Sequence, residues 1–127
     1  MSYYYARKFD LPFDLAVESV VAELEEQGFG ILTEIDVAQT LEKKLGETFR
    51  PYRILGACNP AFAHRALLAE DKIGTMLPCN VVVQQLDREV EIAAVDPLAS
   101  MQAIDNPELA ELAREVGNRL RAAVDAV

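Results

Sequence analysis

The chain has 127 residues, 51% of them hydrophobic and 26% charged. This balance is typical of one globular domain, which we expect to span residues 1–127, and a chain of this length needs no disulfide or metal to fold. Twelve Lys and Arg against 21 Asp and Glu give a formal net charge of −9, which would repel phosphate groups and predicts no nucleic-acid partner.

The first half of the chain predicts alternating strands and helices. A strand is expected over residues 2–9, a helix over 12–27, a strand over 29–35 and a short helix over 36–46. Pro12 and Gly28 stand at the start and just past the end of the longer helix, where these residues are favoured. Alternation places the odd-numbered residues from Phe29 to Ile35 on one face of the second strand.

The second half adds three strands and two helices. A strand is expected over 52–57, a helix from 59 to about 70, an irregular return over 71–78, strands over 79–86 and 89–95, and a final helix opened by residues 105–107. Asn59 before Pro60 is typical of a helix N-cap. The polar turn at Asp87 and Arg88 predicts an antiparallel hairpin.

The predicted order is β-α-β-α-β-α-β-β-α. The hairpin excludes an all-parallel sheet. We therefore expect an α+β fold, with a mainly antiparallel sheet of about five strands and two long helices packed on one face.

Three stretches resemble a known family: GFGILTEIDV at residues 28–37, ILGACNP at 54–60, and IGTMLPCNVVV at 73–83, with Asp96-Pro97 closing the hairpin. Over nearly its whole length the chain resembles the domain-of-unknown-function 302 family. The resemblance implies a fold similar to the TATA-box-binding-protein-like arrangement, and self-association into a homodimer. It implies no established activity, cofactor or catalytic residue, and a likeness of fold to a DNA-binding protein does not transfer that function.

The chain has two cysteines, and each begins a Cys-Asn pair. An antiparallel return over residues 71–78 would bring the two pairs together, whereas a parallel crossover would leave them at opposite ends of the sheet. The hairpin-rich pattern favours the first arrangement. The candidate ligand-binding residues are therefore Cys58, Asn59, Cys79 and Asn80.

Two chemical interpretations of this region remain open. Cys58 precedes a helix N-terminus, which favours a thiolate, and Cys58, Cys79 and His64 are soft ligands suited to zinc or copper(I). The structural alternative makes both cysteines small buried apolar residues, Asn59 an N-cap and Asn80 a partner of local backbone groups. The spacing of 20 residues between the cysteines matches no zinc motif.

Two further features are candidates for function. Glu34 and Asp36 lie two apart on one strand and hence on one face, where carboxylates do acid–base work or bind a cation, unless one is a surface charge and the other a helix cap. The tyrosine-rich first strand, with Tyr52, would line the uncovered face of the sheet. That face would carry residues from a set that includes Tyr3, Tyr5, Ile31 and Thr33, or their alternates, as an interface or ligand surface, unless it is ordinary edge packing.

The absence of an apolar signal segment, and of any stretch near the ~18 apolar residues of a membrane span, predicts a cytoplasmic protein with no membrane partner. The leading hypothesis is a non-enzymatic binding or interaction module, a homodimer with a small-molecule or metal pocket near the Cys-Asn pairs. The alternatives are a thiol-dependent redox or metal-binding protein using Cys58 and Cys79, and a purely structural or regulatory partner protein.

Overall fold

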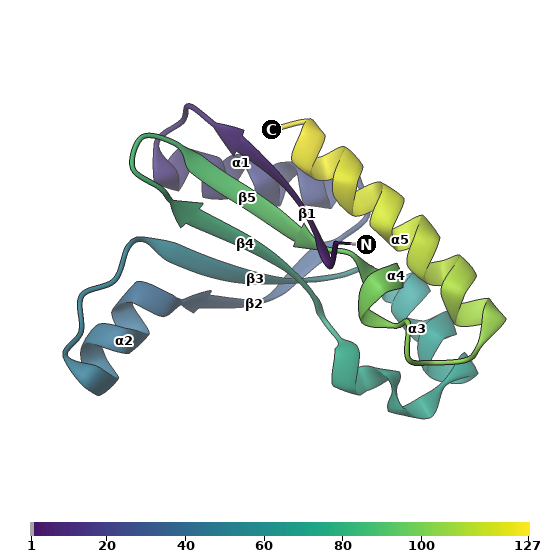
Figure 1. Cartoon of the computed structure of the whole chain (residues 1–127). Helices are drawn as coiled ribbons and strands as arrows, with labels where there is room; N and C mark the ends of the chain where they lie inside the picture. The colour runs from purple at the N-terminus through teal and green to yellow at the C-terminus, as the bar shows by residue number, and fades with distance from the viewer. Residues whose placement is uncertain (1) are drawn as a thin grey trace.

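The computed structural model describes residues 2–127 and contains one sheet with helices on one face and at both ends (Figure 1). The strands are β1 (Tyr4–Phe9), β2 (Gly30–Asp36), β3 (Tyr52–Cys58), β4 (Cys79–Gln85) and β5 (Val90–Val95). The helices are α1 (Phe13–Glu26), α2 (Val37–Leu45), α3 (Pro60–Ala69), the 3-10 helix η1 (Asp71–Met76), α4 (Pro97–Ser100) and α5 (Pro107–Asp125). The strand order is β1-β5-β4-β3-β2, and every neighbouring pair is antiparallel. The predicted α+β class is confirmed.

Side-chain caps set where most of the helices after α1 begin. Asp36 Oδ1 accepts from the Gln39 N–H at 2.9 Å and starts α2. An Asn or Asp followed by Pro begins α3, α4 and α5 in the same way. The short helix α4 was not predicted, because Asp96-Pro97 was interpreted only as the end of a strand.

One face of the sheet is buried under the two long helices α1 and α5. Residues that pair across the strands share a face, and Leu55, Val81 and Ala94 form one such buried row. The helices cover this row with apolar residues that are themselves fully buried: Val20, Leu24, Leu120, Ala123 and Val124. The hydrophobic core therefore lies between the sheet and this helix pair.

A β-bulge changes the facing of β2. Ile31 pairs with Ala57 and Thr33 pairs with Gly56, so Leu32 is the extra residue. Ile31 packs on the core, whereas Thr33 falls on the opposite face. The prediction that the odd-numbered residues of this strand share one face is therefore wrong beyond Ile31.

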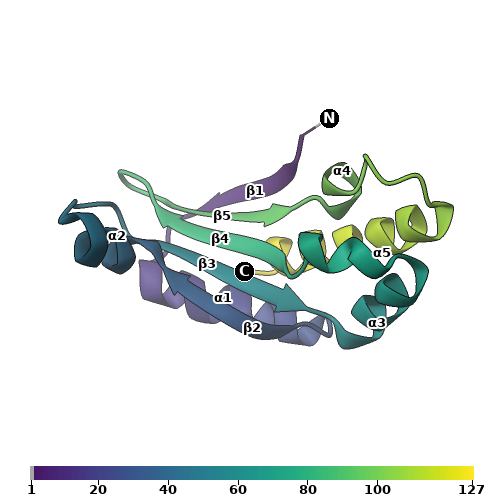
Figure 2. The ribbon, with the colours of Figure 1, turned by 90° about the horizontal axis from the view of Figure 1, so that it is seen from below.

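The other face of the sheet has no helix packed across it, and Figure 2 looks onto it with α1 and α5 behind. We call it the outer face. It carries Tyr4 and Tyr52, whereas Tyr5 points to the helix side and donates to Asp125 Oδ1 on α5 at 2.6 Å. Of the predicted tyrosines, Tyr3 therefore lines the uncovered face together with Tyr4 and Tyr52, whereas Tyr5 does not. None of the helices in the described chain is long and apolar enough to cross a membrane.

Candidate functional site

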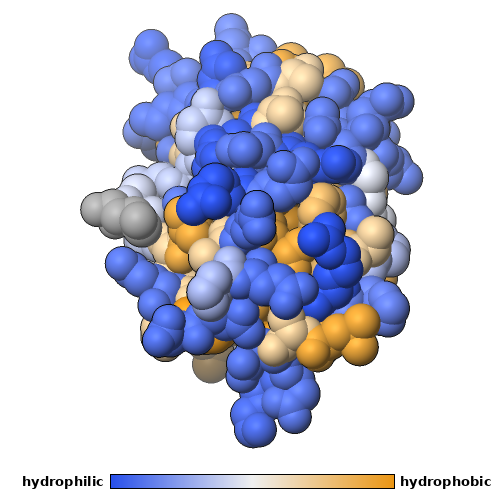
Figure 3. Space-filling view, turned by 90° about the vertical axis from the view of Figure 1, so that its right-hand side faces the viewer, coloured by the Kyte–Doolittle hydropathy of each residue, from blue (hydrophilic) through white to orange (hydrophobic). Residues whose placement is uncertain are grey.

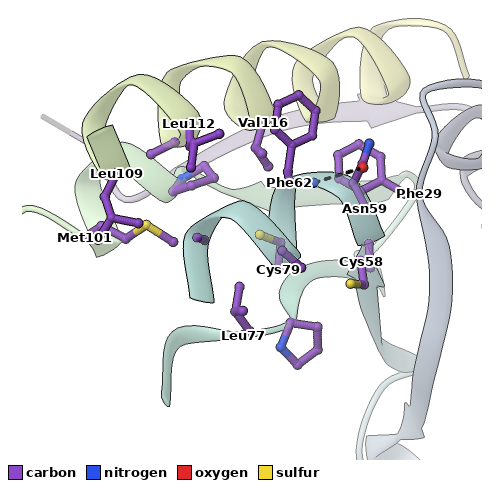
Figure 4. Close-up of a pocket in the computed structure, with 16 residues that line it drawn as sticks. Phe29, Cys58, Asn59, Phe62, Leu77, Cys79, Met101, Leu109, Leu112 and Val116 are labelled. Carbon is purple, nitrogen blue, oxygen red and sulfur yellow. Dashed lines mark hydrogen bonds between the residues drawn. The ribbon is translucent and has the colours of Figure 1, made fainter. Parts of the chain in front are cut away.

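The predicted antiparallel return is confirmed, and it brings the two cysteines to the same end of the sheet. Ala57, the neighbour of Cys58, pairs with Cys79 across β3 and β4. Both cysteines line a cavity of about 40 Å³, which we call the end cavity (Figure 4). Its other walls come from α3, from the segment around α4 and from the first turns of α5. The labelled wall residues in Figure 4 include Phe62, Leu77, Met101, Leu109, Leu112 and Val116.

Two residues, Asn59 and Gly56, help to shape the end of the sheet that contains the cavity. Asn59 Oδ1 accepts from the Phe62 N–H at 3.4 Å, which confirms Asn59 as the N-cap of α3. Gly56 has no side chain, and a Cβ there would overlap Thr33 Oγ1 and lie 2.7 Å from Pro78 Cγ. The glycine therefore lets Pro78 lie close against β3 at the edge of the cavity.

Cys79 is a buried thiol, only 8% exposed. Burial, and secondarily the nearby charge of an ionised Cys58, raises the pKa of Cys79 to about 11. At neutral pH its side chain is therefore protonated and behaves as a small apolar group.

Cys58 is half-buried, and both cysteines are free thiols. Figure 4 shows the two sulfur atoms turned to different sides rather than toward each other. The arrangement therefore presents one apolar thiol inside the cavity and one partly exposed thiol at its edge.

His64 does not join the cysteines. It is exposed, whereas Phe62 and Ala66 face the end cavity, and 100° of rotation per residue turns His64 to the far side of α3. Within residues 2–127 no three His, Cys, Asp or Glu side chains are grouped closely enough to hold a metal ion. The predicted ligand set of Cys58, Cys79 and His64 is therefore not assembled.

Asn80 also leaves the predicted site. It follows Cys79 on β4, so its side chain points to the opposite face, where it is exposed and pairs across from Gly56. Of the four predicted ligand-binding residues, Cys58, Asn59 and Cys79 line the end cavity, and Asn80 borders the outer face instead.

Glu34 and Asp36 share a face as predicted, and one arginine binds both. Arg53 lies 2.7 Å from Glu34 Oε1 and 3.6 Å from Asp36 Oδ2, while Asp36 also caps α2. The two carboxylates are thus a surface ion-pair cluster and a helix cap.

Phe62 connects the end cavity to the surface of α5. The Arg119 guanidinium lies 5.1 Å from the centre of the Phe62 ring and donates to the Gln27 carbonyl at 3.2 Å. These contacts link α3, α5 and the end of α1 beside the cavity. Seen from the side of α3, α4 and the start of α5, the surface is mostly hydrophilic, with hydrophobic residues in separate patches (Figure 3).

Comparison of the sequence with known protein families identifies the family of the chain. Residues 5–127 match the family model described as "Domain of unknown function DUF302". The chain belongs to the DUF302 family. The resemblance found in the sequence is thereby confirmed over nearly the whole chain. No protein of curated function matches the chain.

A solved DUF302 structure is closely similar to the chain. The crystal structure of an uncharacterised conserved DUF302 protein from Bacillus stearothermophilus superposes with a TM-score of 0.93 at 30% sequence identity. The match covers 99% of this chain and 98% of that one. The two chains therefore share the described fold over almost all of their length.

Proposed function

We propose that the chain is a non-enzymatic cytoplasmic binding module that works as a homodimer and takes a small apolar group into the end cavity. The main support for an apolar ligand is the chemistry of the cavity wall. Its side chains are nearly all apolar, and the one fully enclosed thiol, Cys79, stays protonated at neutral pH.

The size of the end cavity limits the ligand. A volume of about 40 Å³ has room for roughly three water molecules, and apolar walls give water few hydrogen bonds. Whole drug-sized ligands need pockets of about 300 Å³ or more. The ligand class that fits is therefore a short alkyl group, either a free small molecule or the end of a larger one.

The same geometry favours binding over thiol chemistry. A catalytic or redox-active thiol needs a lowered pKa, since the thiolate is the reactive form, and the pKa of Cys79 is raised. The two sulfur atoms also point to different sides (Figure 4). A thiol-dependent role would have to rest on Cys58 alone.

Xenon is a suitable probe, because it is small and apolar and enters dry cavities. We expect dissolved xenon to shift the methyl NMR signals of Met101 and Ala113, which line the end cavity. Ala63→Leu, which adds bulk to the wall, should abolish these shifts. The matched control is Ala61→Leu, at an exposed residue two positions before Ala63 on the same helix, and it should leave the shifts unchanged.

Two results would contradict the ligand part of the proposal. One is an absence of xenon shifts at Met101 and Ala113 in the native chain. The other is equal shifts in the native chain and Ala63→Leu, with circular dichroism verifying that the variant is folded. The homodimer has its own measurement, since light scattering of the native chain at micromolar concentration should give twice the monomer mass of 14.0 kDa.

A further inference from the structure

An apolar row crosses the middle of the outer face from edge to edge. The register aligns one outward residue from each of the five strands: Ala6, Ala93, Val82, Ile54 and Ile35. These residues are exposed or half-buried, in contrast to the fully buried row beneath α1 and α5. Val82 lies on the central strand and in the central row, so it marks the middle of the face.

The outer face combines large and small side chains. A groove of about 400 Å³ lies on it, and its lining includes Tyr4, Tyr52, Val82 and Ala93. Large aromatic side chains and small residues therefore occur on one surface. A two-fold interface requires this combination, because each copy presents both the protrusion and the recess.

The charge of the outer face differs from that of the whole chain. Among the outward residues of the described strands only Lys8 and Glu91 are charged, and they pair across β1 and β5. Gln84 donates to Glu91 at 3.0 Å, and Arg50 at the rim donates to Gln84 at 2.9 Å. Two copies that each carry a net charge of −9 repel each other, but this face carries no excess of negative charge.

The area of the outer face also fits a second sheet. Five strands spaced ~4.8 Å apart and about six residues long cover a flat area of about 480 Å². Stable interfaces bury about 600 Å² or more of accessible surface per partner. Because side chains project from the sheet, the accessible area of the outer face is larger than this flat area and comes close to that value. A single helix is only about 10 Å wide and would cover less than half of the face.

We propose that the homodimer forms through the outer face, with two copies packed sheet against sheet and Val82 close to the two-fold axis. This inference rests on the homodimer of the proposed function and names its surface. Tyr4 of each copy then packs against the small residues of its partner.

This arrangement can be tested with two variants that place a positive or a negative charge at Val82, in the centre of the outer face. Val82→Lys and Val82→Glu each bring two like charges together across the axis, so each variant alone should dissociate, with a dimer Kd at least about 100-fold higher than that of the native chain. An equal mixture of the two variants should recover the dimer, because Lys then meets Glu. The matched control Leu68→Lys makes the same change at a residue of α3 that is 76% exposed, and it should leave the dimer intact.

Sedimentation velocity at micromolar concentration separates the outcomes. A native chain that sediments as a monomer overturns the homodimer and this interface together. A native dimer that Val82→Lys leaves intact overturns the interface alone. Monomeric variants that do not recover when mixed overturn the placement of Val82 near the axis, provided that circular dichroism verifies that both variants are folded.

Discussion

Cys79 is the residue whose surroundings change its chemistry most. It begins β4, pairs with Ala57 and faces the end cavity with 8% of its surface exposed. Burial removes most of the water around the sulfur, so a thiolate there would be poorly solvated and the neutral thiol is favoured. This residue therefore connects burial directly to the pH dependence of stability.

The stability of the chain should fall in alkaline solution because of Cys79. Its pKa rises from an ordinary value of 9.0 to about 11 in the folded chain. Below pH 9 the thiol of Cys79 is protonated in both the folded and the unfolded chain, and its contribution to the free energy of unfolding is fully present. Between pH 9 and 11 only the unfolded chain loses this proton, so the contribution declines. Urea titrations should therefore show a loss of about 2–3 kcal/mol across this window.

Other groups titrate in the same range, so the measurement needs a matched variant. Cys79→Ala removes the thiol, and the cost of the space it leaves does not depend on pH. The difference in unfolding free energy between the native chain and this variant should shrink from pH 9 to 11. A difference that stays constant would mean that Cys79 ionises as readily in the folded chain as in the unfolded one.

The side-chain repeat of strands and helices determines for which predicted site residues the sequence alone indicates the face on which they lie. Alternation along a strand separates Cys79 from Asn80, and helix rotation separates His64 from Phe62. Both outcomes follow from the predicted elements, although the ligand sets were chosen by proximity in sequence. A pocket near the cysteines was expected, but the volume and the walls of the end cavity could not be predicted, because the apolar patterns of α3 and α5 do not indicate where packing leaves space.

At the scale of elements, α2 depends on its ends more than on packing. None of its residues is buried, and it lies at one end of the sheet, beside the start of α1 and away from α5 (Figures 1 and 2). Asp36 caps its start, and Gly46, with a φ of 67°, ends it. With so little burial, the cap should decide much of its local stability.

Two substitutions at Asp36 separate its cap from its charge. Asp36→Ala removes both and should destabilise α2 by roughly 1 kcal/mol, which hydrogen exchange of the α2 amides would detect as faster exchange. Asp36→Asn keeps a capping oxygen but loses the charge that lies 3.6 Å from Arg53. It should retain most of the protection, and equal losses in the two variants would assign the effect to the ion pair.

The elements themselves were largely predictable, and the exceptions have physical reasons. The order of strands and long helices followed from apolar periodicity and from the caps. The helix α4 was missed, although Asp96-Pro97 has the same form as Asn59-Pro60, which was interpreted correctly. The bulge at Leu32 depends on the pairing of β2 with β3, which no pattern within β2 contains.

At the scale of the whole molecule, negative charge is in excess. The net charge is −9, while Arg53 with Glu34 and Asp36 is one of the few clusters that place opposite charges in contact. Unbalanced charges of one sign repel one another more strongly in the compact state than in the unfolded chain. Dissolved salt screens this repulsion.

Salt should therefore stabilise the folded chain. Raising sodium chloride from about 20 to 200 mM reduces the range of charge–charge interactions by roughly a factor of three. We expect the melting temperature to rise by about 3–6 °C, which corresponds to about 1 kcal/mol for a domain of this size. A lower melting temperature in salt would mean that the few ion pairs outweigh the general repulsion.

The pairing of β1 with β5 has a consequence for synthesis of the chain. Tyr4 is made well before Val95, yet the two are partners. While the ribosome adds residues in order, β1 has no partner until β5 has emerged, whereas β4 can pair with β3 well before that point. Strand β1 is thus made before the other four strands but is one of the last to be incorporated, and its apolar and aromatic side chains remain unpaired until β5 has emerged.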